Sequence, residues 1–139
     1  MTTRVIALGL AALALVGCDN SPSTGGARDN DAALLQFARE ALPLMQGLER
    51  CRNAYGSYPP NAEAIVGCLP RNTSLVRQGS FIKVGNWMIS PDDTGVGYTM
   101  TRQLEGRGML VRRCARQTCR WIYDPGNGKP AAEVKLTPR

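Results

Sequence analysis

The chain has 139 residues, 17 basic and 11 acidic side chains with a net charge of +6, and five cysteines but no histidine. This length suffices for one modest hydrophobic core. The lack of histidine removes the commonest general base, and the sequence contains neither a G-x-S-x-G nucleophile motif nor a phosphate-binding loop. We therefore expect no enzymatic activity and no cofactor.

The first residues have the layout of a secretory signal. Arg4 gives a positive start, an apolar run extends from Val5 to Val16, and the small Gly17 precedes Cys18. The run is well short of the roughly 20 apolar residues of a membrane-spanning helix. Its last four residues, L-V-G-C, resemble the lipobox of bacterial lipoproteins. The resemblance implies that residues 1–17 are a signal peptide and that acylated, palmitate-bearing Cys18 anchors the mature protein in a lipid bilayer. An ordinary signal peptide with an unmodified cysteine is the alternative.

The segment after the cysteine predicts both a destination and a tether. Asp19 followed by Asn20 resembles the signal that retains lipoproteins in the inner membrane, which implies a periplasm-facing anchor there, with the outer membrane as the alternative. Residues 18–30 are rich in serine, glycine, proline and asparagine, so we expect a flexible tether. The folded domain is then predicted to span residues 31–139.

An amphipathic helix is predicted from Asp31 to Gly56. Its apolar stripe consists of residues three or four apart, namely Leu34, Ala38, Ala41, Met45, Leu48, Cys51 and Tyr55. Asn30 or Asp31 can cap the start, and Gly56 can end the helix. Pro43 either kinks this helix or begins a second one, and we expect a kink. A short second helix is predicted from Asn61 to Gly67.

The rest of the chain favours strands. Four segments with β-branched or aromatic residues, 80–90, 95–103, 108–114 and 119–124, are separated by turn residues, and the tail can add an edge strand near Glu133 to Leu136. The predicted fold is an α+β domain in which a long N-terminal amphipathic helix and a short second helix pack on an antiparallel meander of about four strands.

If Cys18 is acylated, an even number of cysteines remains: Cys51, Cys68, Cys114 and Cys119. In an exported chain this number predicts disulfide bonds, and three connectivities are open. Proximity favours Cys114 with Cys119 across a hairpin, where Arg112 would lie opposite Trp121. The spacing and the absence of histidine argue against a metal site.

The segment from Leu44 to Pro59, L-M-Q-G-L-E-R-C-R-N-A-Y-G-S-Y-P, resembles the periplasmic part of type IV pilins and type II secretion pseudopilins. Gly56, Tyr58 and Pro59 carry the match. The resemblance implies a pilin-like domain that serves a pilus or a secretion system. Those families also have a hydrophobic N-terminal helix that forms the filament core. The lipobox and the polar tether replace that helix here, so the chain would not enter a filament in the family's way.

One surface is a candidate for binding. Five arginines and a tryptophan concentrate between residues 107 and 123, namely Arg107, Arg112, Arg113, Arg116, Arg120 and Trp121. We expect an accessory lipoprotein that binds envelope proteins. The alternative is a free-standing periplasmic module or inhibitor that uses this basic hairpin against an acidic protein or DNA. A sheet with one solvated face produces the same alternation, and nucleic acid is the less favoured partner.

Overall fold

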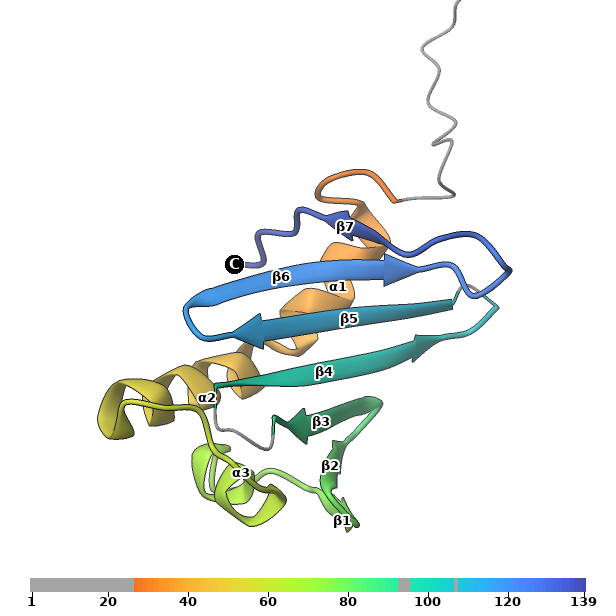
Figure 1. The fold of residues 1–139 in the computed structure, drawn as a ribbon. Coiled ribbons are helices and arrows are strands. Elements are labelled where there is room, and N and C mark those ends of the chain that lie inside the picture. The colour runs from red at the N-terminus through yellow and green to blue at the C-terminus, as the bar shows by residue number, and fades with distance from the viewer. Residues whose placement is uncertain (1–26, 93–95, 107) are drawn as a thin grey trace, which may run out of the picture.

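The computed structural model describes residues 27–92, 96–106 and 108–139. Three helices come first: α1 (Ala32–Glu40), α2 (Leu42–Tyr55) and α3 (Ala62–Cys68). Seven strands follow: β1 (Val76–Gln78), β2 (Phe81–Val84), β3 (Trp87–Pro91), β4 (Gly97–Leu104), β5 (Gly108–Ala115), β6 (Thr118–Asp124) and β7 (Ala132–Val134). They form one antiparallel sheet in sequence order, and the helices lie on one side of it (Figure 1).

The predicted long helix is wrong, because the chain forms two helices that meet at Ala41. Pro43 lies in the first turn of α2, where the backbone N–H groups have no partner within the helix, so that a proline removes no hydrogen bond. The expected kink is therefore a helix boundary. The other predicted caps are confirmed: the Asp31 side chain accepts hydrogen bonds at the start of α1, and Gly56 ends α2 with a φ of 79°.

The predicted four-stranded meander is also wrong, because the sheet has seven strands. Segment 80–90 was expected as one strand and folds as the hairpin β2–β3. Val84 pairs with Trp87 around the two-residue turn Gly85–Asn86, where Gly85 has a φ of 57°. Strand β1 is exposed along its whole length and was not predicted, whereas β7 overlaps the predicted edge strand.

The core lies between the helices and the inner face of the sheet. The predicted helix stripe is buried at all positions except Tyr55, which is 80% exposed. The stripe packs in one cluster with apolar residues of the inner sheet face, among them Ile82, Ile89, Met100 and Leu110. Transfer of such side chains from water supplies most of the folding free energy.

The two ends of the described chain are joined beside β7. The backbone N–H of Asn30 donates to the Lys135 carbonyl at 2.7 Å, and the Asp29 carboxylate accepts from the Lys135 N–H at 3.0 Å. The Asn30 side chain accepts from the Thr137 N–H at 2.9 Å. The folded part thus begins before Asp31, and the first described residues lie beside the β7 edge (Figure 1).

The predicted disulfide bonds are confirmed. Cys51–Cys68 joins α2 to α3, and Cys114–Cys119 joins β5 to β6. No helix in the described ranges is both long and apolar enough to cross a membrane. Cys18 and the predicted signal lie outside the described residues.

Candidate functional site

The hairpin β5–β6 has the register that the cysteines predict. Cys114 lies opposite Cys119, and Arg112 lies opposite Trp121. Alternate residues of a strand point to opposite faces of the sheet, so this register divides the predicted binding residues between the two faces. Arg107 lies outside the described residues.

Arg112 and Trp121 belong to the inner, helix-covered face. Trp121 is 3% exposed, and its ring contacts the Trp87 ring edge-on with 6.2 Å between centroids. The Arg112 guanidinium lies 5.0 Å from the Trp121 ring centroid, close enough for a cation–π contact. Trp121 is therefore a packing residue and offers no exposed ring to a ligand.

Arg113 and Arg120 belong to the outer face, and both are exposed. They lie directly opposite each other on neighbouring strands, which is an unfavourable position for two like charges. The next cross-strand pair along the hairpin is Val111 with Ile122. The outer face thus places two exposed positive charges beside an apolar row.

Acidic residues lie on the far side of that row and at its β7 end. Asp124 follows Ile122 on the outer face of β6, and Glu133 of β7 lies opposite Ile122. The Asp124 carboxylate accepts a hydrogen bond from the Gly126 N–H at 2.9 Å, which fixes its position. These residues, with the two arginines, line a shallow groove of about 430 Å³.

Arg116 lies in the turn between β5 and β6, apart from the other arginines. It has a φ of 58°, and its backbone N–H donates to the Val96 carbonyl. A smaller hollow of about 280 Å³ separates this turn from the end of α2, where Arg52 and Ser57 line it. Arg116 therefore faces the helix exit and lies beyond the ends of the paired strands.

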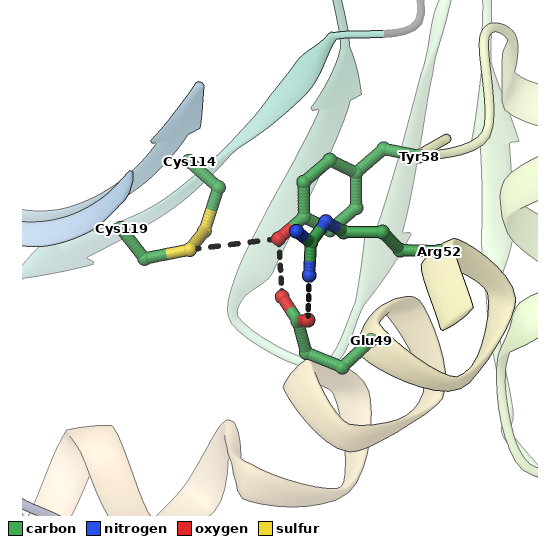
Figure 2. Close-up of polar contacts among 5 residues, drawn as sticks. All are labelled: Glu49, Arg52, Tyr58, Cys114 and Cys119. Carbon is green, nitrogen blue, oxygen red and sulfur yellow. Dashed lines mark hydrogen bonds and ion pairs between the residues drawn. A yellow bond between two sulfur atoms is a disulfide. The ribbon is translucent and has the colours of Figure 1, made fainter. Parts of the chain in front are cut away.

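A polar cluster that sequence reasoning missed lies behind the hairpin (Figure 2). The Tyr58 hydroxyl donates a hydrogen bond to the Glu49 carboxylate, which also forms an ion pair with Arg52 at 3.4 Å. The same hydroxyl oxygen lies 3.7 Å from the Cys119 sulfur. The cluster joins α2 and its exit loop to the disulfide end of the hairpin. The Y-P of the helix exit was the only sequence signal of it, because the partners are far apart in the chain.

Burial controls the protonation of the tyrosines in this region. Burial raises the pKa of Tyr58 above its ordinary value of 10.0, and the hydrogen bond to Glu49 raises it further. Burial also raises the pKa of Tyr98, an effect that the positive charge of Arg112 opposes. Both hydroxyls therefore stay neutral at physiological pH and act as structural groups.

Glu49, Cys114 and Cys119 bring one carboxylate oxygen and two sulfurs within 4.8 Å of one another. Thiolates, not disulfide sulfurs, are the ligands that soft metals require. Because the two sulfurs are bonded to each other, this group does not form a metal site in the oxidised protein.

A second hollow, of about 390 Å³, lies beside the Cys51–Cys68 disulfide. Tyr55, Pro59 and Pro60 contribute to its wall, and no charged residue lines it. No residue of the hairpin lines it, so it is separate from the hairpin surface.

Comparison of the chain with protein-family models, curated proteins and solved structures finds no match.

Proposed function

We propose that the protein is an exported, lipid-anchored module that works by binding proteins, and that the outer face of β5–β7 is its binding surface. The observation that carries this proposal is the pairing of exposed Arg113 and Arg120 beside the Val111–Ile122 row, on the face opposite the helices. Val111 is 8% exposed and Ile122 is half-buried, so the charged side chains supply most of the exposed surface around this row. A protein interface combines such polar groups with apolar side chains. The L-V-G-C segment supports the anchor.

The machinery of a pilus or of type II secretion is the partner class that the resemblance of residues 44–59 favours. The local chemistry of that segment is consistent with it. Gly56 ends α2 in the left-handed region, and the Tyr58 ring packs edge-on against the Tyr98 ring with 5.1 Å between centroids. The inner membrane, with the anchor facing the periplasm, is the proposed location.

A second candidate function is inhibition or capture of an acidic protein or polymer through the hairpin arginines. The exposure of Arg113, Arg116 and Arg120 favours it. DNA is a weaker candidate than an acidic protein, because single-strand binding combines cations with exposed aromatic rings and Trp121 is buried. Binding of DNA would also weaken steeply with added salt.

The test is a crosslinking pull-down of the full chain from membranes, with the recovered proteins identified by mass spectrometry. We expect reproducible partners for the wild type and their loss for the double variant Arg113→Glu/Arg120→Glu. Arg50→Glu is the control for a charge reversal elsewhere on the surface, because Arg50 is an exposed cation on α2. The proposed surface is wrong if Arg50→Glu removes the partners and the hairpin variant keeps them.

A further inference from the structure

The charges of the outer face form a self-complementary pattern along β6. Arg120, Ile122 and Asp124 follow one another on this face, which places a cation and an anion at equal distances on either side of an apolar residue. Strand geometry sets these distances at about 7 Å each. On β5, Arg113 lies beside Arg120, and on β7, Glu133 lies beside Ile122. On this face the row with the two arginines and the row with Asp124 therefore lie on opposite sides of the Val111–Ile122 row.

We infer that the outer face binds a second copy of this chain, face to face, around a two-fold axis that runs along the Val111–Ile122 row. This inference rests on the proposed function and names the partner of its surface. A two-fold axis in the plane between two stacked sheets reverses the strand direction and keeps each residue's place along the axis. It therefore sets Arg120 of each copy opposite Asp124 of the other.

The stacking distance suits these contacts. Packed sheets lie about 10 Å apart, which an arginine and an aspartate side chain can bridge between them. Ile122 of one copy then meets Ile122 of the other on the axis, while Glu133 lies at the rim within reach of the second copy's Arg120. Each copy's Arg113–Arg120 repulsion is relieved by carboxylates of the other copy.

The position of the anchored end agrees with this axis. The Val111–Ile122 row runs across the sheet toward β7, so the two-fold axis leaves the dimer at the β7 edge. Asn30 is bonded to Lys135 beside that same edge. Residues 27–30 of both copies therefore lie on the same side of the dimer, as two chains anchored in one membrane require. Residues 19–26 carry no large apolar side chain, so they offer no apolar cover for the row.

The area indicates a weak interface. The outer face of β4–β7 measures roughly 20 Å by 25 Å from strand spacing and rise, which is about 500 Å² per copy. Stable complexes bury about 800 Å² per partner. The dimer should therefore form reversibly, and the experiment must be made where the full chain is concentrated, in the cell.

The test places the photo-crosslinking amino acid p-benzoylphenylalanine at position 122 of the full chain in cells. We expect an adduct with twice the mass of the chain, and no such adduct when the same amino acid replaces Gln46, which is exposed on α2. Arg120→Asp or Asp124→Arg should each reduce the adduct at least about fivefold. The double variant Arg120→Asp/Asp124→Arg should restore most of it, because exchange of the two charges preserves the central 120–124 pair across the axis and alters only the contact with Glu133 at the rim.

The double variant also separates loss of the interface from loss of the fold. Arg120 and Asp124 are four residues apart on one strand, about 13 Å, so that restoration cannot come from a contact within one chain. An adduct from position 122 with a different protein, in place of the double-mass product, overturns the dimer and leaves the proposed function standing. Absence of any adduct from position 122 overturns both.

Discussion

Tyr58 fixes the helix exit through its hydroxyl as well as its ring. The ring packs on Tyr98, and the hydroxyl is the donor that Glu49 accepts. Tyr58→Phe leaves the packing in place and removes the donor, so we expect a loss of about 1–2 kcal/mol in the free energy of unfolding. Urea denaturation measures it. Tyr55→Phe is the control, because Tyr55 is 80% exposed. Equal effects of both changes would contradict this role.

The raised pKa values of Tyr58 and Tyr98 predict loss of stability at alkaline pH. In each case the folded chain holds the phenolic proton more tightly than the unfolded chain, whose pKa is near 10.0. This contribution is fully present below pH 10 and is lost as the pH rises through the folded pKa. We expect the urea midpoint to fall above about pH 10. Tyr58→Phe should flatten that decline, and an unchanged slope would refute the assignment to Tyr58.

Gly47 and Gly67 form a matched pair of helical glycines with opposite surroundings. A Cβ at position 47 would meet the Cys68 carbonyl oxygen more closely than real Cβ atoms approach, whereas a Cβ at position 67 would meet nothing within 4 Å. Gly47→Ala should therefore destabilise the protein by more than about 1 kcal/mol through displacement of α3. Gly67→Ala should stabilise it by about 0.5–1 kcal/mol, because alanine favours the helix. Thermal unfolding of both variants tests the pair.

At the level of elements, the sequence predicted the pieces whose ends carry distinctive chemistry. Asp31, Asn61 and Gly56 act as the predicted caps, and the paired cysteines set the hairpin register. The split at Ala41 could not be predicted, because proline fits both a kinked helix and the first turn of a new one. The β2–β3 turn was missed because Gly85–Asn86 interrupts an otherwise continuous apolar segment, although this dipeptide is a hairpin signal.

The two disulfides should contribute unequally. Cys51–Cys68 closes a loop with a sequence separation of 17, and Cys114–Cys119 closes one of 5. In the chain-entropy model the longer loop is worth about 3 kcal/mol and the shorter about 2 kcal/mol. We expect the double alanine variant at 51 and 68 to unfold at lower urea than the one at 114 and 119. The reverse order would show that the hairpin disulfide acts through packing around Tyr58 instead.

At the scale of the whole molecule, the sequence did not predict which face of the sheet the helices cover. The alternation of β5 and β6 placed Arg112 and Trp121 on one face and Val111 and Ile122 on the other. Each face therefore combined an arginine with apolar residues, and neither pattern identified the interior. Which face becomes the interior depends on contacts with α1 and α2, which lie far from β5 and β6 in the chain. As a result the sequence located the basic hairpin and could not separate its buried arginine from its exposed ones.

The proposed anchor and the inferred interface on the outer face should act together, because an interface of about 500 Å² per copy is too small to hold two free domains at low concentration. Confinement by a short tether raises the effective concentration of a second site, in favourable cases to the millimolar range.

We therefore predict that replacement of residues 1–18 by a cleavable secretory signal without a lipobox releases the protein from the membrane. At matched protein levels it should also reduce the double-mass adduct from position 122 at least about tenfold. Fractionation and the in-cell crosslink measure the two effects in one culture. Release without a loss of the adduct would show that the outer faces associate unaided, and retention on the membrane would refute the role of Cys18.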